Sequence, residues 1–213
     1  MVEKYKNKYR VKSHRLEGWD YSDNGYYFVT LVTQNRQCNL GEIVKDGMVL
    51  SKMGKIIDDE WNKSFEIRSE LFLDRYVVMP NHLHAIIILE NTRCRDTRPC
   101  VSRKPKSISS FIAGYKSAVN SKIDDFIDEN NLNIPKYNHN NHFFQSNYYD
   151  HIIRNENDYI QILQYIIDNP TKWALDKLNA SQHAETHGRV PLRGEGTGVI
   201  PVSVLETNKI LPP

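Results

Sequence analysis

The chain has few of the features that mark secreted, membrane-spanning or disulfide-stapled proteins. Its 213 residues include only three cysteines, an odd number without the paired spacing of a zinc site. This suits a reducing compartment, and we expect a cytoplasmic protein. Cys94 and Cys100 admit a metal or redox pair, although spare thiols in a loop are the simpler interpretation. No apolar run approaches the ~20 residues that cross a bilayer, and the N-terminal segment lacks the apolar stretch of a signal peptide.

A strong net charge is absent as well, since the formal charge at pH 7 is +2. The basic residues are nevertheless concentrated in two segments, residues 1–15 and 91–106. Each segment carries six Lys or Arg residues and a single acidic one. Such segments are typical of proteins that bind a polyanion, but a solvated tail and a solvated loop explain them equally well.

Length and hydrophobic patterning predict one domain over residues 1–179, with a flexible basic insert at 91–106 and a flexible tail at 180–213. Strands are expected at residues 25–33, 70–79 and 82–89, and a hairpin at 40–50 turning at Asp46 and Gly47. Helices are expected after Ser51, from Ile108, and over residues 156–168 with Asn155 as the cap. The pattern predicts an α+β sandwich, with helices against one mainly antiparallel sheet.

Two histidines interrupt a run that otherwise predicts a buried strand, "YVVMPNHLHAIIIL" at residues 76–89. Residues two apart on a strand point to the same face, so His82 and His84 project side by side. Neutral imidazole is a common ligand of transition metals, and a pair on one rigid strand favours a metal site over two structural histidines. His139, His142 and His151 are weaker candidates for a further ligand.

The helix expected at residues 156–168 carries a tyrosine in an unusual position. On a helical wheel its apolar face comprises Tyr159, Ile160, Leu163, Ile166 and Ile167. Tyr165 lies instead on the polar side, and Asn169 follows it by one turn. A phenol with a pKa of ~10 is a poor nucleophile at neutral pH, so it needs an activated electrophile. A divalent ion held by His82, His84 and Asn169 could polarise a phosphate for in-line attack by Tyr165.

Four motifs carry a resemblance to a known family. "YYFVTLVTQNRQCNLGEI", "MPNHLH", "YYDHIIRNENDY" and "YIIDNP" occur in that order between about residues 9 and 173. Together they resemble the REP-associated tyrosine transposases, a branch of the bacterial single-tyrosine HUH transposases. Relatives outside this branch carry Gln where Asn169 stands.

The resemblance implies a ferredoxin-like fold with the His-Leu-His strand in a central antiparallel sheet. It also implies that His82, His84 and Asn169 bind Mg²⁺ or Mn²⁺ and that Tyr165 is the nucleophile. The family cleaves and rejoins single-stranded DNA at hairpins formed by palindromic repeats, through a 5′-phosphotyrosine intermediate. Relatives include both monomers and dimers.

Candidate DNA contacts are basic residues that meet phosphates and aromatic residues on which unpaired bases stack. The candidates are Lys104, Lys106, Lys116, Arg154, Tyr148 and Tyr149. For Arg154, an ion pair with Asp150 or Asp158 is an equally good explanation. Two other functions stay open: a nucleic-acid-binding module without catalysis, and a metal-dependent nuclease that uses water in place of tyrosine.

Overall fold

The structure is a computed structural model of the whole chain. It describes residues 4–5, 8–9, 15–16, 18–91, 106–138 and 140–179. Several expectations therefore lie outside the described residues: the flexible tail at 180–213, nearly all of the 91–106 insert including Lys104, and His139. None of the helices in the described ranges is long and apolar enough to cross a membrane.

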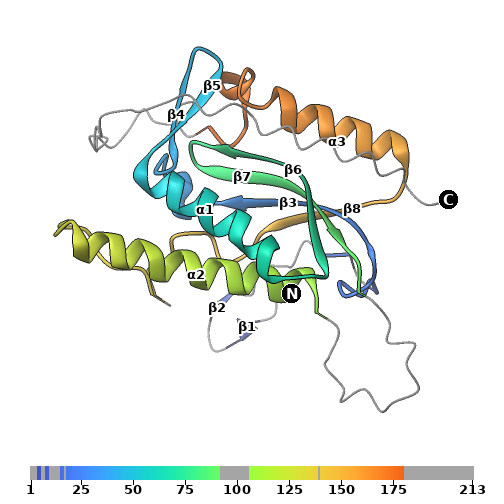
Figure 1. Cartoon of the computed structure of the whole chain (residues 1–213), viewed down its shortest axis with the longest axis horizontal. Coiled ribbons are helices and arrows are strands. Elements are labelled where there is room, and N and C mark those ends of the chain that lie inside the picture. Colours follow the sequence, from blue (N-terminus) through green and yellow to red (C-terminus); the bar gives the residue numbers. More distant parts are fainter. Residues whose placement is uncertain are drawn as a thin grey trace.

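A four-stranded antiparallel sheet forms the centre of the molecule (Figure 1). Its spatial order is β6-β7-β3-β8. Two small hairpins lie apart from this sheet, one of β1 and β2 and the other of β4 and β5. The strands are β1 (Lys4–Tyr5), β2 (Lys8–Tyr9), β3 (Gly25–Val32), β4 (Gly41–Val44), β5 (Gly47–Leu50), β6 (Leu71–Met79), β7 (His82–Leu89) and β8 (Tyr149–Ile153).

Helices cover the two faces of the sheet unequally. Two of them, α1 (Lys52–Ile67) and α2 (Ile108–Glu129), lie together on one face, and α3 (Glu156–Asp168) lies on the other (Figure 1). The chain order β3-α1-β6-β7-α2-β8, with β3 and β7 central, is the ferredoxin-like arrangement, so the expected fold class is confirmed. Short 3-10 turns at Gln34–Arg36 (η1) and Trp173–Leu175 (η2) follow β3 and α3.

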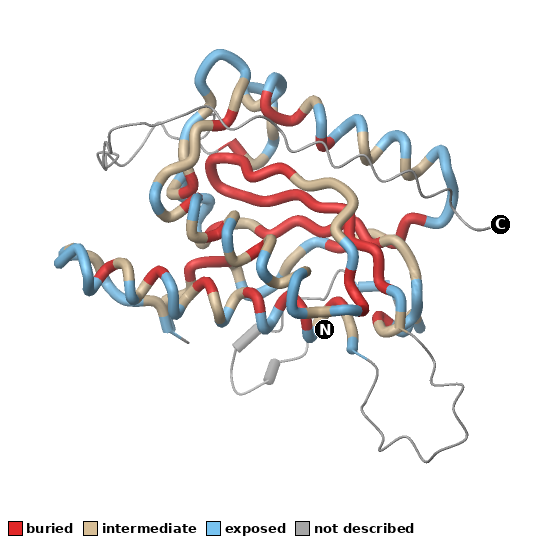
Figure 2. Tube along the Cα trace, in the orientation of Figure 1, coloured by how far each residue is buried: buried red, intermediate tan, exposed pale blue. Residues whose placement is uncertain are grey.

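Two hydrophobic clusters hold these layers together, and the central strands are buried on both faces (Figure 2). The larger cluster lies between the sheet and the α1–α2 layer, around Trp61, Phe111 and Leu83. The smaller one lies beneath α3, where Ile166 packs with Phe28 and residues of β6 and β7. The His-Leu-His strand is therefore rigid, because every residue of β7 is buried.

Local sequence signals account for most element boundaries. The Ser51 side chain accepts a hydrogen bond from the Gly54 amide at the start of α1, and Asn155 accepts one from the Asp158 amide at the start of α3, so both expected caps are confirmed. The hairpin at residues 40–50 is also confirmed. Its turn lies one residue earlier than expected, because Lys45 and Asp46 are its two left-handed residues.

The sequence patterns miss or misplace some features. β8 was not expected, and neither was the β1–β2 hairpin. The expected apolar face of α3 is partly wrong, since Ile160 and Ile167 are exposed and the helix packs through Tyr159, Leu163 and Ile166. The reason is that α3 covers only part of the sheet, so the buried stripe is narrower than the apolar sequence suggests.

Candidate metal and nucleophile site

The two histidines of β7 lie side by side on the face of the sheet that α3 covers. Their strand is fixed in register by β3, where Val32 pairs with His82 and Thr30 pairs with His84. Both imidazoles are buried, and their ring centroids are 4.4 Å apart. The sequence expectation of a same-face pair is confirmed.

Hydrogen bonds orient the two rings. Nδ1 of His84 lies 2.8 Å from the Thr30 hydroxyl, and Nδ1 of His82 lies 2.8 Å from Oδ1 of Asn81. Exchanging the oxygen and nitrogen of the Asn81 amide would break two hydrogen bonds, because the nitrogen donates to the carbonyl oxygens of Arg36 at 3.1 Å and Leu178 at 2.7 Å. Oδ1 must therefore accept a hydrogen bond from Nδ1–H of His82, which leaves the lone pair of this ring on Nε2.

Burial keeps both rings neutral. Desolvation lowers the pKa of His82 to about 4 and that of His84 well below its ordinary value of 6.5. The neighbouring His82 ring lowers the pKa of His84 further, whereas Asp176 opposes the shift at His82. At neutral pH both rings are thus in the neutral form that binds metals, and on His82 it is Nε2 that carries the lone pair.

Oxygen ligands come from the segment that follows α3. Side-chain atoms of His82, His84 and Asp176 all lie within 4.8 Å of one another. Two buried polar atoms close to this point have no hydrogen-bond partner, His82 Nε2 and Asn169 Oδ1. Buried acceptors without donors are costly in a folded protein, and a cation would satisfy both.

The donor set therefore fits a divalent ion: two imidazole nitrogens, the Asn169 amide oxygen and the Asp176 carboxylate. Imidazole nitrogens suit transition metals and the oxygen donors suit Mg²⁺ or Mn²⁺, so the mixed set is compatible with either kind of divalent ion.

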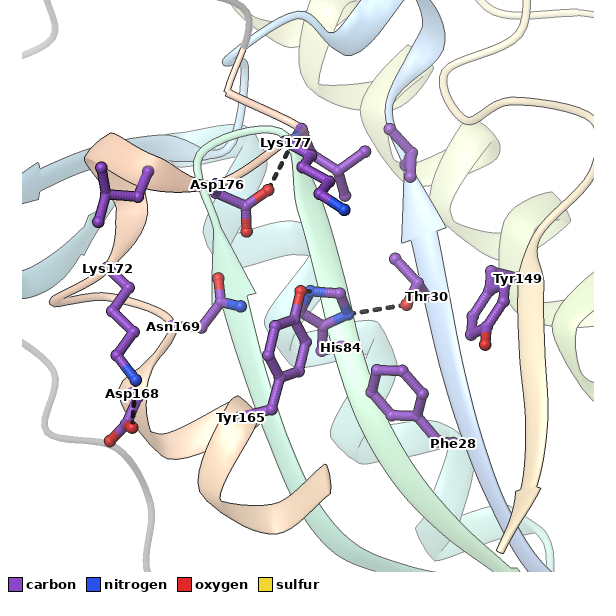
Figure 3. A pocket seen from close by; sticks show the side chains of 13 residues that line it. Phe28, Thr30, His84, Tyr149, Tyr165, Asp168, Asn169, Lys172, Asp176 and Lys177 are labelled. Atoms are coloured by element: carbon purple, nitrogen blue, oxygen red, sulfur yellow. Dashed lines mark hydrogen bonds and ion pairs between the residues drawn. The ribbon is translucent and has the colours of Figure 1, made fainter. Parts of the chain in front are cut away.

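Tyr165 points from α3 toward the same place (Figure 3). Its hydroxyl lies 3.2 Å from Nε2 of His84, and its ring meets the His84 ring at a centroid distance of 5.1 Å. The side chain is 46% exposed, as expected for a tyrosine on the polar side of its helix. Burial of the hydroxyl end and the nearby Asp176 carboxylate raise the pKa of Tyr165 above 10. The phenol is therefore protonated at neutral pH.

The candidate DNA-binding lysines in the described residues are engaged within the protein. Lys106 forms an ion pair with Glu70 at 2.9 Å. The ammonium of Lys116 donates to the carbonyl oxygens of residues 145–147, the shortest of these bonds being 2.6 Å to Gln145. Tyr148, which is half-buried, stacks beneath the cations of Arg15 and Lys116. These three residues lie away from the histidine pair.

The remaining two candidates, Arg154 and Tyr149, lie at different distances from Tyr165. Arg154 is exposed at the N-terminal end, with its guanidinium 5.9 Å from the Trp19 ring, and no ion pair with Asp150 or Asp158 is found. It precedes α3, whose first residue, Glu156, lies about 14 Å from Tyr165 along the helix at ~1.5 Å per residue. Tyr149, by contrast, lines the same cavity as Tyr165.

Sequence reasoning missed two residues of this site. Asp176 follows a helix and a proline and shows no periodic relation to the histidines, so no signal in the sequence could have indicated it. Asn81 belongs to the Pro-Asn pair that interrupts the strand, and its position next to His82 is a signal that could have been used. The weaker candidates His142 and His151 are not part of the cluster, and His151 pairs with Asp158 at 2.8 Å.

Comparisons with known proteins find one relative in sequence and a shared fold. No protein-family model matches the chain. An uncharacterized protein of Haemophilus influenzae is 31% identical over 179 residues, which are 78% of this chain and 92% of that protein. Among solved structures, a REP-associated tyrosine transposase bound to a REP hairpin superposes with a TM-score of 0.50 at 20% identity, over 90% of this chain and all of the other. The chain therefore belongs to the family of the Haemophilus influenzae protein, and its fold is that of the REP-associated tyrosine transposase.

Proposed function

We propose that the protein is a metal-dependent, single-tyrosine transposase that cleaves and rejoins single-stranded DNA. One observation carries this proposal: the hydroxyl of a half-exposed tyrosine lies beside a cluster of buried atoms that could ligate a metal. The hydroxyl of Tyr165 is 3.2 Å from His84 Nε2, and His82 Nε2 and Asn169 Oδ1 are unpartnered close by. A nucleophile next to a cation site is what an in-line attack on a phosphodiester requires.

In the proposed reaction, the Tyr165 oxygen forms a bond to phosphorus and the bond from phosphorus to the 3′ oxygen breaks. The phenol loses its proton to water, which reaches the half-exposed side chain, and the departing 3′ oxygen gains one from water. The products are a 5′-phosphotyrosine and a free 3′-hydroxyl. Because the covalent link conserves the phosphodiester energy, attack by a later 3′-hydroxyl rejoins DNA without ATP.

The protein residues prepare this step in two ways. Thr30 and Asn81 hold the Nδ1 side of the two rings, so that both Nε2 atoms face the site. With Nδ1 of His84 donating to Thr30, its Nε2 keeps one lone pair, which would accept from the Tyr165 hydroxyl or ligate an ion. When bound, a divalent ion would polarise the phosphate and neutralise the charge that develops on it.

The solved neighbour is bound to a REP hairpin, which supports hairpin-bearing single-stranded DNA as the substrate class. We therefore propose stem-loops with unpaired flanks as the test substrate and Mn²⁺ or Mg²⁺ as the ion. We also propose that the protein acts in the bacterial cytoplasm.

The test is formation of a DNA–protein adduct on a denaturing gel after incubation with hairpin DNA and Mn²⁺. We expect an adduct with the native protein and none with Tyr165→Phe. Tyr149→Phe is the matched control, because it removes a hydroxyl from another exposed tyrosine of the same cavity and should keep the adduct.

Other outcomes of the same assay identify the alternatives. Cleavage that survives Tyr165→Phe would show a nuclease that uses water. Binding of DNA without any cleavage would show a non-catalytic binding module. His82→Ala should abolish cleavage while leaving DNA binding in place, and intact cleavage in that variant would refute the metal assignment.

A further inference from the structure

One part of the sheet lies open next to the candidate nucleophile. The face that carries His84 also carries Phe28 and Thr30 of β3 and Tyr149 of β8, because Thr30 pairs with both His84 and Tyr149. α3 lies over β6 and β7. Within the described residues, the end of this face over β3 and β8 is left as a cavity of about 610 Å³ (Figure 3).

Aromatic rings form the wall of this cavity. Phe28 is buried and stacks on the His84 ring at 5.4 Å. The rings of Tyr149 and Tyr165 each meet Phe28 edge-to-face at a centroid distance of 6.2 Å. Both tyrosines remain about half exposed, at 50% and 46%. Large aromatic surface left open in a hollow is typical of a ligand site.

The position of the cavity points to its occupant. Tyr165 and His84 belong both to the cavity wall and to the candidate nucleophile and metal site. A phosphate attacked by Tyr165 is joined to its base through one sugar, so that base lies next to the cavity. The exposed Lys177 lines the cavity, where it can meet a phosphate of the same strand, and the exposed Lys172 lines it as well but pairs with Asp168 at 2.8 Å.

We propose that this cavity holds one unpaired base of the DNA strand at the attacked phosphate, and that the base stacks on Tyr149. This rests on the proposed function and adds a base-binding site to it. The volume fits, since pockets for small ligands measure roughly 300–1,000 Å³. Stacking on an aromatic ring accepts any base, so the site positions the strand without reading its sequence.

The test measures binding to a fluorescein-labelled DNA hairpin flanked on both sides by ten thymidines, with EDTA present so that no cleavage occurs. A second hairpin carries abasic flanks of the same length. The native protein should bind the thymidine-flanked hairpin about 5- to 150-fold more tightly, the range expected for one stacked base. If the native protein binds the two hairpins equally, or binds neither, this result alone would overturn the proposal.

Variants then locate the effect. Tyr149→Ala should lose most of the preference for thymidine flanks, whereas Tyr149→Phe keeps the ring and should retain it. Phe72→Ala is the matched control, because Phe72 is a 41% exposed aromatic on the opposite edge strand, β6, and does not line the cavity. The slope of log affinity against log salt should stay unchanged in Tyr149→Ala, since no phosphate contact is removed.

The results separate this proposal from the proposed function. If Tyr149→Ala keeps the full preference while the native protein still forms the Tyr165 adduct, the base site is wrong and the chemistry stands. If the preference depends on Tyr149 but no adduct forms with Mn²⁺, the base site stands and the chemistry is wrong.

Discussion

Asn81 should control the metal affinity of the site without being a ligand itself. Its amide nitrogen donates to two backbone carbonyls, those of Arg36 and Leu178, and its amide oxygen accepts from Nδ1 of His82. Asn81→Leu keeps a similar shape and removes all three hydrogen bonds. His82 then loses the partner that fixes its tautomer. The chain around Leu178, close to Asp176, loses the hydrogen bond that joins it to the residue before β7.

The expected magnitude follows from these contacts. Loss of an outer partner of a metal-binding histidine typically lowers metal affinity 10- to 100-fold, or about 1.4–2.8 kcal/mol. Two lost amide–carbonyl bonds at about 1 kcal/mol each should also lower the melting temperature by roughly 4–8 °C in a chain of this size.

A matched control separates these two effects. The Asn91 amide nitrogen also donates to two carbonyl oxygens, those of Ser22 at 2.7 Å and Lys106 at 3.0 Å, but beyond the opposite end of β7. Asn91→Leu should therefore cost similar thermal stability and leave the metal affinity unchanged.

The assay is the dissociation constant of Mn²⁺, obtained from the electron paramagnetic resonance signal of the free ion. Nitrogen-15 NMR of the imidazoles adds a readout that needs no metal: His82 should be protonated at Nδ1 in the native protein and should lose that preference in Asn81→Leu. A folded Asn81→Leu variant that binds Mn²⁺ as tightly as the native protein would refute this reasoning.

Two further predictions concern the stability of the scaffold. Gly54→Ala should destabilise the protein by about 1–3 kcal/mol in urea unfolding, because the new methyl group would lie 2.0 Å from the Leu40 carbonyl oxygen. Gly114→Ala in α2 is the control. Its methyl group meets nothing within 4 Å, so this variant should be neutral or slightly stabilised. Burial tends to raise the pKa of Glu70, but hydrogen bonds from Lys106 and Arg68 outweigh it and hold the pKa below 4.5. The stability that these bonds contribute is present above pH 4.5 and lost as the pH falls through the folded-state pKa. The free energy of unfolding should therefore fall more steeply with acid in the native protein than in Glu70→Gln. Parallel curves of unfolding free energy against pH would count against the interaction.

The sequence predicts those parts of the protein that depend on local patterns. The strand that carries His82 and His84 begins and ends where expected, because an apolar run and a Pro-Asn break are both local. Tyr165 was identified for the same reason, since a helical wheel separates it from the apolar stripe. β8 was missed because the polarity of its residues does not follow their burial: the charged Asp150 is buried and the aromatic Tyr149 is exposed.

Contacts between distant segments could not be predicted in the same way. The two carbonyls that hold the Asn81 amide belong to residues 45 positions before it and 97 positions after it. Asp176 reaches the histidines only because η2 and the residues after it fold back onto the end of β7. Such placements depend on the packed core as a whole, for which a single sequence gives no local signal.

The candidate site combines residues of the central strand β7 with residues of α3 and the segment that follows it. The imidazoles are fixed by the register of the central strands, whereas Tyr165, Asn169 and Asp176 all lie on one segment that begins in α3. That segment carries the proposed nucleophile, both proposed oxygen ligands and one wall of the aromatic cavity, so a displacement of the segment as a whole would shift all of them. Asn81 ties the segment to the histidine strand. Metal binding, attack and base binding should therefore be coupled, and loosening this one amide should weaken all three.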